Sequence, residues 1–147
     1  MMTTAEQIFA SAPLMADERI YRLVRLPSAA ITAGAGLLAE IGTPFSALIA
    51  DRHEVTLVLP QAEWEMLGAR LPDAEQGALY RLITFDVPLD PTLTGFFALV
   101  SDILAKAGVS ILALSAFQRD HVLIPADQFA TAWSALQAAQ QALRGNG

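Results

Sequence analysis

The sequence predicts an α+β fold in which helices cover one face of an antiparallel sheet, and it predicts that this unit occurs twice. Apolar runs rich in β-formers alternate with helical patterns in the order strand, helix, strand, strand, helix in each half of the chain. Tyr21-Arg22-Leu23 recurs as Tyr80-Arg81-Leu82, and Leu57-Val58-Leu59-Pro60 recurs as Val122-Leu123-Ile124-Pro125. An aromatic residue follows each of these prolines, Trp64 in the first half and Phe129 in the second. An internal duplication explains these repeats, and one six-stranded domain with chance similarity is the alternative.

The length and the connectors suggest where the units begin and end. A chain of 147 residues can bury the core of one ordinary domain or of two very small ones. Residues 69–78 form a polar connector with turn-forming residues, which is the best internal boundary. We therefore expect an N-terminal arm over residues 1–18, a first unit over 19–77 and a second unit over 78–147. The arm is weakly patterned, which fits a short helix or a loose segment.

In the first half, a β-rich run over residues 20–26 ends at Pro27 and predicts a strand. A helix over 28–41 follows, weakened by Gly34 and Gly36, which cost ~1 kcal/mol each against alanine. Strands are predicted over 44–50 and 55–59, and a short helix begins at Pro60. The interrupted helix leaves open that the first unit is incomplete or borrows a strand.

In the second half, we expect a strand over 79–87 and then a helix that ends before Gly108. The apolar face of this helix holds Leu93, Phe96, Phe97, Val100, Ile103, Leu104 and Ala107. The next strand, 109–117, is apolar on both sides, which is typical of a strand covered on both faces or lying at an interface. A strand over 121–124 and a helix from Pro125 complete the unit.

Composition excludes several classes of function. The net charge is -6 with no basic patch, which disfavours nucleic acid and anionic membranes as partners. Without cysteine there is no disulfide, zinc-thiolate site or thiol catalysis, and a cytoplasmic location is compatible. The longest apolar region, 95–117, contains Asp102 and Lys106 and therefore predicts no transmembrane helix. The arginine and alanine bias suggests a GC-rich bacterial genome, and the hydrophobic content of 54% suggests that a partner covers apolar surface.

No catalytic constellation is evident. The two histidines, His53 and His121, are not spaced as metal ligands and have no carboxylate cluster beside them. Asp51 and Glu54 flank His53, but such a turn is usually solvated. No phosphate-binding glycine loop, nucleophile elbow or metalloprotease motif occurs. We therefore expect no enzyme activity, no metal and no cofactor.

Two joints of the second half could bind a small molecule. At the glycine loop Thr92-Leu93-Thr94-Gly95, a helix begins, and free N–H groups at such a start attract a carboxylate. Gly95 would let a ligand approach the backbone, although the same loop is also an ordinary helix entry. At the turn 115–120, Asp120 could bind an amine, satisfy its own backbone or pair with Arg119. Phe117 could contact the apolar part of a ligand or lie in the core.

Three segments carry a resemblance to a known family. They are Leu89-Asp90-Pro91-Thr92-Leu93-Thr94-Gly95, Ala107-Gly108-Val109-Ser110-Ile111 and the run from Leu114 to Ile124. They resemble the second half of the small tandem ACT-domain proteins, the group related to the CASTOR arginine sensors. The first half matches more loosely, through Phe45-Ser46-Ala47-Leu48 and residues 54–58.

The resemblance implies ferredoxin-like βαββαβ units that associate edge to edge and bind amino acids or other small molecules at the interface. The ligand-binding residues that it implies are Leu93, Thr94, Gly95, Phe96, Ser115, Ala116, Phe117 and Asp120, with Ala47 and Leu48 contributed by a partner unit. Family members usually have threonine at the position of Ala116 and a small polar residue at that of Arg119. The first difference removes a hydroxyl and the second adds a positive charge, so arginine is disfavoured as the ligand.

These observations together predict a non-catalytic regulatory or sensor protein that binds an amino acid or a similar small molecule and forms a homodimer. One alternative is a ligand-free oligomerisation module with a degenerate pocket, which the loss of a hydroxyl at Ala116 would fit. Another alternative is a small enzyme built on the same scaffold, because fold does not determine function.

Overall fold

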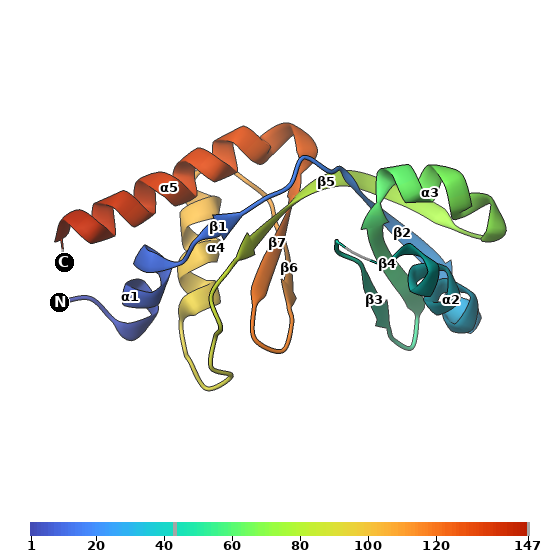
Figure 1. Ribbon diagram of the computed structural model, residues 1–147, viewed down its shortest axis with the longest axis horizontal. Coiled ribbons are helices and arrows are strands. Elements are labelled where there is room, and N and C mark those ends of the chain that lie inside the picture. Colours follow the sequence, from blue (N-terminus) through green and yellow to red (C-terminus); the bar gives the residue numbers. More distant parts are fainter. Residues whose placement is uncertain (43, 147) are drawn as a thin grey trace. The chain divides into compact units, whose positions relative to one another are not determined.

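The computed structural model describes residues 1–42 and 44–146, which divide into two compact units (Figure 1). The central unit comprises residues 18–80, and the terminal unit comprises residues 1–17 together with 81–147. The central unit contains β2 (Tyr21–Pro27), η1 (Ser28–Ala30), α2 (Ile31–Ile41), β3 (Ala47–Ala50), β4 (Glu54–Pro60), α3 (Gln61–Leu67) and η2 (Gly68–Arg70). The terminal unit contains α1 (Thr4–Ser11), β1 (Leu14–Met15), α4 (Phe96–Lys106), β6 (Leu112–Ser115), β7 (Asp120–Pro125), η3 (Ala126–Gln128) and α5 (Phe129–Asn146). Strand β5 (Glu75–Phe85) passes from one unit into the other.

The central unit is a complete βαββαβ unit. Its strands lie in the order β3-β4-β2-β5, with residues 75–80 of β5 as the fourth strand. All of the pairs are antiparallel, and the register of β2 against β5 shifts at a bulge between Arg22 and Val24. One face of this sheet packs on α2 and α3 around a core of Val24, Leu26, Leu37, Val55, Leu57, Leu59, Trp64 and Leu71. The predicted α+β, ferredoxin-like fold is confirmed here.

Helix α2 forms despite its two glycines because one of them is needed for packing. A Cβ at Gly34 would lie 2.9 Å from Leu26 Cδ1 and 3.3 Å from Leu57 Cδ2, so glycine lets the helix approach the sheet closely. Gly36 faces open space, since nothing lies within 4 Å of a Cβ built there. The intrinsic cost of Gly34 in a helix is therefore offset by the burial of its neighbours.

The terminal unit takes its fourth strand from the other end of the chain. Residues 81–85 of β5 begin the unit, and the strand order is β6-β7-β5 with β1 on the remaining side of β5. Strand β1 pairs antiparallel with β5 through Leu14 opposite Phe85 and Met15 opposite Thr84. The sequence left open that the first unit borrows a strand. In the structure it is the terminal unit that takes a strand from elsewhere in the chain, namely β1 near the N-terminus.

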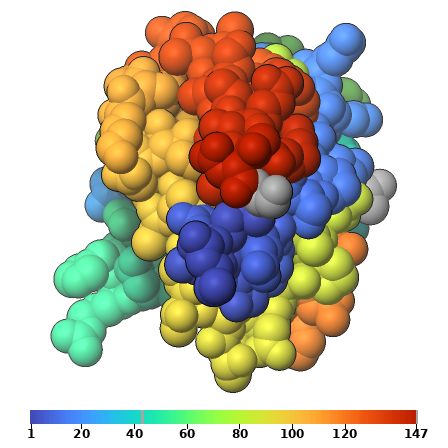
Figure 2. Space-filling view, turned by 90° about the vertical axis from the view of Figure 1, so that its left-hand side faces the viewer, coloured from blue at the N-terminus to red at the C-terminus, as the bar shows by residue number. Residues whose placement is uncertain are grey.

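The first 17 residues form an ordered part of the terminal unit. Helix α1 begins with a capping box, in which Thr3 N–H donates to Glu6 Oε2 at 2.8 Å and Glu6 N–H donates to Thr3 Oγ1 at 3.1 Å. Phe9 of this helix is fully buried against the rings of Phe85 and Phe96. Of the two forms expected for this segment, the short helix is therefore the one observed, and Figure 2 shows it beside the end of α5.

The strand predicted over 109–117 is shorter than expected and lies at a sheet edge. Gly108, with a φ of 76°, ends α4, and only Leu112–Ser115 form β6. Leu112 and Ala113 are exposed, so this chain does not cover both faces of the strand. The prediction of a doubly covered strand is therefore wrong for the chain by itself, and coverage at an interface stays a proposal. Among the described residues, no helix is long and apolar enough to cross a bilayer.

Candidate functional site

The glycine loop and the β6–β7 turn together enclose a pocket of about 390 Å³ within the terminal unit. From the first joint it is lined by Leu89, Pro91, Leu93, Gly95, Phe96, Phe97 and Ala98, and from the second by Ser115, Ala116, Phe117, Gln118 and Asp120. The two walls are joined directly, because Leu89 N–H donates to the Gln118 carbonyl at 2.6 Å. Seven of the ten residues predicted from the sequence line this pocket: Leu93, Gly95, Phe96, Ser115, Ala116, Phe117 and Asp120.

The loop before α4 is shaped by its own side chains. Asp90 Oδ1 accepts hydrogen bonds from Thr92 N–H at 2.8 Å and from Thr92 Oγ1 at 2.6 Å. The Thr92 hydroxyl, followed by the Thr92 N–H, lowers the pKa of Asp90 from its ordinary value. Leu93 N–H closes the turn on the Asp90 carbonyl at 2.9 Å. Thr92 is therefore used to form the loop and does not cap the helix.

Helix α4 begins without a side-chain cap. Its N-cap is Gly95 in the left-handed conformation, with a φ of 89°, and no side chain caps the first turn. The first helical hydrogen bond runs from Leu99 N–H to the Gly95 carbonyl at 3.0 Å. The N–H groups of Phe96, Phe97 and Ala98 precede that bond, and all three residues line the pocket. This wall of the pocket therefore favours an anion.

The opposite wall carries the only charged side chain among the lining residues, Asp120. Ser115 and Asp120 are directly opposite each other on β6 and β7, so their side chains project from the same face of the sheet. The turn between them is closed by Ala116 N–H, which donates to the Arg119 carbonyl at 2.8 Å. A hydroxyl and a half-buried carboxylate therefore face the start of α4 across the pocket.

Arg119 does not add a free positive charge to the pocket. Its Nε donates to Asp86 Oδ1 at 2.9 Å, with both side chains 39% exposed, and Arg119 is not a lining residue. The expectation of an added charge is corrected because Asp86 balances it. The alternative that Asp120 pairs with Arg119 is wrong for the same reason.

Three other predicted residues lie elsewhere. Thr94 is exposed in the loop and does not line the pocket. Ala47 and Leu48 lie on β3, an edge strand of the central unit, opposite Val58 and Leu57 of β4. Their contribution to a ligand site stays a prediction.

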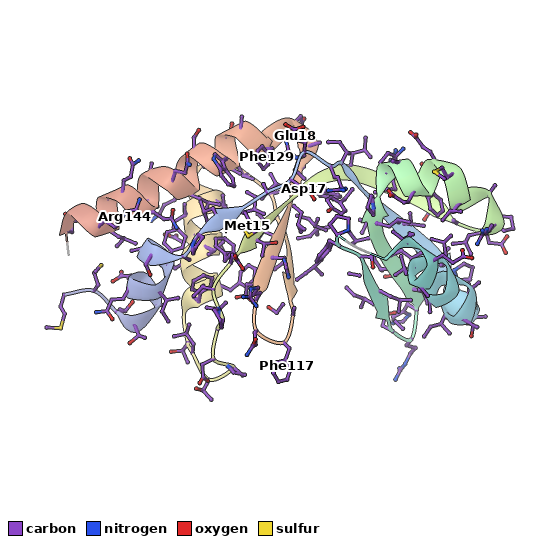
Figure 3. All side chains as sticks on the ribbon, viewed as in Figure 1. Met15, Asp17, Glu18, Phe117, Phe129 and Arg144 are labelled. Atoms are coloured by element: carbon purple, nitrogen blue, oxygen red, sulfur yellow. The ribbon has the colours of Figure 1, made fainter. Side chains whose placement is uncertain are left out.

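Phe117 is not a core residue, which removes one of its two sequence interpretations. Its side chain is 89% exposed at the end of the β6–β7 hairpin and points away from it (Figure 3). The turn residue belongs to no strand, because β6 ends at Ser115. One part of the pocket wall is therefore an exposed aromatic ring.

Sequence reasoning missed five lining residues: Leu89, Pro91, Phe97, Ala98 and Gln118. Phe97 and Ala98 could have been found, because a ligand at a helix start meets the first three residues of the helix. Phe97 was assigned to the apolar face of the helix, and the structure has it half-buried at the pocket. Gln118 gave no signal of its own beyond its place between Phe117 and Arg119.

The corresponding joints of the central unit are built differently. Helix α2 follows a 3-10 turn, and its N-cap is Ala30 instead of a left-handed glycine. In the β3–β4 turn, Asp51 Oδ1 accepts hydrogen bonds from His53 N–H at 2.7 Å and from Glu54 N–H at 3.0 Å. The His53 N–H, followed by that of Glu54, lowers the pKa of Asp51. The carboxylate of Asp51 is thus engaged by the backbone of its own exposed turn.

The histidines form no metal site. His53 is exposed, whereas His121 is half-buried and its Nδ1 lies 2.8 Å from Thr84 Oγ1. Burial lowers the pKa of His121, with Arg119 acting in the same direction and Asp120 opposing it. Within residues 1–42 and 44–146, no group of three or more histidine, aspartate or glutamate side chains is placed to hold a metal ion.

Comparison with known proteins supports the fold. Residues 77–138 match the family model described as the ACT domain. No curated protein sequence matches the chain. Solved structures with similar folds include a Vibrio cholerae protein of unknown function described as a possible transport protein, at 23% identity and a TM-score of 0.72, covering 92% of this chain and 94% of that one.

Two further structures extend the comparison. A protein from Agrobacterium tumefaciens has 23% identity and a TM-score of 0.67, covering 86% of this chain and 87% of that one. The regulatory subunit of aspartate kinase from Thermus flavus has 18% identity and a TM-score of 0.62, covering 86% and 95%. At these identities, the likenesses establish a shared fold.

Proposed function

Because residues 77–138 form an ACT domain and the whole chain has the tandem ACT fold, we propose that this protein is a non-catalytic regulatory or sensor protein. Its ligand is an amino acid or a similar small molecule that carries both an anion and an amine. One observation carries this proposal: the uncapped start of α4 and the carboxylate of Asp120 line the same pocket.

The pocket chemistry supports a zwitterionic ligand. A ligand carboxylate accepts hydrogen bonds from the N–H groups at the start of α4, where the helix dipole favours negative charge. A ligand ammonium group donates to Asp120, and such charge-assisted bonds are stronger than neutral ones. A volume of about 390 Å³ is at the lower end of the range for small-molecule sites, which suits a ligand of amino-acid size.

The same lining predicts the character of the ligand's side chain. Leu89, Leu93 and Phe97 offer apolar contacts, and Ser115 and Gln118 offer neutral polar ones. Since Asp120 engages the ammonium group, no second carboxylate in the lining is left for a cationic side chain. We therefore expect a neutral side chain, apolar or small and polar, to bind better than that of arginine.

The family resemblance adds a partner unit to the site. We propose that the chain forms a homodimer and that a β3 edge strand, at Ala47 and Leu48 of a partner copy, completes the pocket. The exposed apolar residues Leu112 and Ala113 on the edge strand β6 support association through strand edges. A ligand bound across such an interface stabilises the dimer by its differential affinity, which is the proposed sensing mechanism.

A thermal-shift screen with the standard L-amino acids tests this proposal. We expect one amino acid, or a chemically related few, to raise the Tm, because a ligand at a hundred times its Kd adds about 2.7 kcal/mol. Ala98→Trp should abolish the shift, since Ala98 is an exposed lining residue in the first turn of α4. Ala105→Trp is the matched control, because Ala105 is exposed on the same helix and lies outside the pocket lining.

The variant is placed at Ala98 for a structural reason. Any side chain at Gly95 would be strained at a φ of 89°, so that a lost shift there could reflect local distortion alone. Asp120→Asn is the second variant, and it should weaken binding while keeping the shape of the side chain. A shift that persists in Ala98→Trp would contradict the site, and no shift with any amino acid would contradict the ligand class.

One observation favours a second candidate, a ligand-free interaction module. Phe117 is 89% exposed beside Ala116, which lacks the hydroxyl usual in the family. A stable dimer that gives no thermal shift with any amino acid, and that dissociates on Phe117→Ser, would favour this candidate. Turnover of a metabolite would overturn both.

A further inference from the structure

The N-terminal segment, residues 1–17, packs against the pocket residues at the start of α4. A Cβ built on Gly95 would lie 3.8 Å from the Cβ of Ala5, so α1 lies directly against the pocket glycine. The ring of Phe9 packs edge-on against Phe96, the first residue of α4, with 6.3 Å between the ring centroids. Helix α1 therefore packs against Gly95 and Phe96, the two residues at the start of α4.

Two side chains of α5 donate hydrogen bonds to the backbone of this segment. Gln140 is 5% exposed, and its Nε2 donates to the carbonyls of Phe9 at 2.9 Å and Ala12 at 2.7 Å. Arg144 Nη1 donates to the carbonyl of Ala10 at 2.6 Å. The Phe9 carbonyl also accepts from Ala12 N–H at 3.2 Å, so Gln140 adds a second hydrogen bond there. At the carbonyls of Ala10 and Ala12, Arg144 and Gln140 supply side-chain donors at the end of α1, where carbonyls lack helical partners. Figure 2 shows the N-terminal segment in blue beside the end of α5 in red.

The segment also reaches the second wall of the pocket. After α1, the Pro13 carbonyl accepts a hydrogen bond from Asp86 N–H at 2.8 Å. The carboxylate of Asp86 in turn accepts from Arg119 Nε, in the turn that leads to Asp120. At its far end the segment is held by Arg81, whose Nη2 donates to the Asp17 carbonyl and whose guanidinium lies 3.8 Å from the Phe129 ring centroid.

We propose that the N-terminal segment is a positioning element of the ligand pocket and that Gln140 is the residue that couples the two. When the segment is docked, α1 fixes Gly95 and Phe96, and the Asp86–Arg119 pair fixes the turn at Asp120. A ligand that needs both walls in place binds the docked state better, so ligand binding and docking stabilise each other. The part of this proposal that concerns a ligand rests on the proposed function, and the part that concerns pocket order does not.

Hydrogen exchange on the full chain tests the proposal without any ligand. Gln140→Leu removes both hydrogen bonds at nearly constant volume, and Gln137→Leu, at an exposed position of the same helix, is the matched control. We expect Gln140→Leu to speed exchange at least tenfold in residues 4–12, and to speed it also in 95–99 and 116–120, with residues 54–60 of the central unit unchanged. Faster exchange confined to residues 4–12 would overturn the proposal, because the segment would then pack without positioning the pocket.

Arg144→Ala serves if Gln140→Leu does not fold, since it removes the hydrogen bond to the Ala10 carbonyl and leaves Gln140 in place. The same three segments should exchange faster in this variant, by a smaller factor. An unchanged rate in residues 95–99 and 116–120, with a raised rate in 4–12, would again overturn the proposal.

A second measurement uses the standard L-amino acids as probes. For whichever amino acid gives the largest thermal shift, Gln140→Leu should raise the Kd about tenfold while Gln137→Leu leaves it unchanged. An unchanged Kd in a Gln140→Leu protein with a lower Tm would overturn the coupling, because the role of Gln140 would then be stability alone. If no amino acid shifts the wild type, the proposed function fails, and the exchange experiment still decides whether the segment positions the pocket.

Discussion

Phe9 and Phe117 lie at opposite extremes of burial. Phe9 lies in a weakly patterned segment and is 0% exposed, whereas Phe117 ends an apolar run and is 89% exposed. Phe9, Phe85 and Phe96 form a three-ring cluster with centroid separations of 5.5 to 6.3 Å. We predict that Phe9→Ala strongly destabilises the terminal unit and that Phe117→Ala does not.

The magnitudes follow from burial. Truncation of a fully buried phenylalanine costs about 3–5 kcal/mol, which combines lost transfer free energy with the cavity left behind. The value for Phe9 should be near the upper end, because two edge-on or tilted ring contacts are lost with it. A surface substitution outside special features usually changes the free energy of unfolding by less than about 0.5 kcal/mol, which is our expectation for Phe117→Ala.

Urea unfolding followed by tryptophan fluorescence measures both variants. Trp133 lies in the terminal unit and Trp64 in the central unit, so a Trp64→Phe background reports on the terminal unit alone. For slopes of about 1–3 kcal/mol per molar urea, Phe9→Ala should lower the midpoint by at least about 1 M. In the same background, Phe117→Ala should leave the midpoint within error.

Two results would refute this reasoning. Equal midpoints for Phe9→Ala and wild type would mean that residues 1–17 contribute no core. A larger loss for Phe117→Ala than for Phe9→Ala would mean that the exposed hairpin end is buried in solution. In that case, the oligomeric state of Phe117→Ala should be measured, because a partner copy would account for the burial.

The remaining predictions concern helix glycines and two turn carboxylates. Gly36→Ala should stabilise the central unit by about 0.5–1 kcal/mol, because α2 has open space there. Gly34→Ala should give no such gain, because its Cβ would meet Leu26. Urea unfolding midpoints reported by Trp64 fluorescence compare the two variants. Gly68→Ala should destabilise the same unit, since a Cβ would lie 2.8 Å from the Trp64 ring, and a midpoint equal to wild type would contradict this packing. Asp90 has a lowered pKa when folded, so its stabilisation is present above its unfolded pKa of about 3.9 and is lost as the pH falls through the lower folded pKa. The Tm advantage of wild type over Asp90→Asn should therefore be present at pH 6, decline as the pH falls below about 4 and vanish below the lowered folded pKa, and Asp51→Asn should behave alike.

Local chemistry explains why much of the fold and seven of the twelve residues that line the pocket could be predicted. The order of strands and helices follows from apolar periodicity, which each segment carries in itself. The loop at Asp90 and Gly95 was predictable for the same reason: an aspartate that bonds two residues onward and a glycine in the left-handed region are short-range features. The pocket at the two joints follows once these elements fold as a βαββ sequence.

Contacts between residues distant in the sequence determine two features that the local sequence pattern does not show: the exposure of β6 and the pairing of Arg119. Edge position determined that β6 is exposed and short, although its residues read as a buried strand. Arg119 pairs with Asp86, 33 residues away in the sequence. The sequence of the turn alone could therefore not show whether the charge of Arg119 acts on the pocket.

The sequence by itself determined the element types, the duplication and the two joints, because each depends on residues within a few positions of one another. Only the tertiary structure decided that the N-terminal segment completes the terminal unit, because its strand pairs with β5 and its helix end is bound by Gln140, 128 and 131 residues away. A weak local pattern carries no record of such contacts, since the burial of Phe9 is supplied by β5, α4 and α5 together.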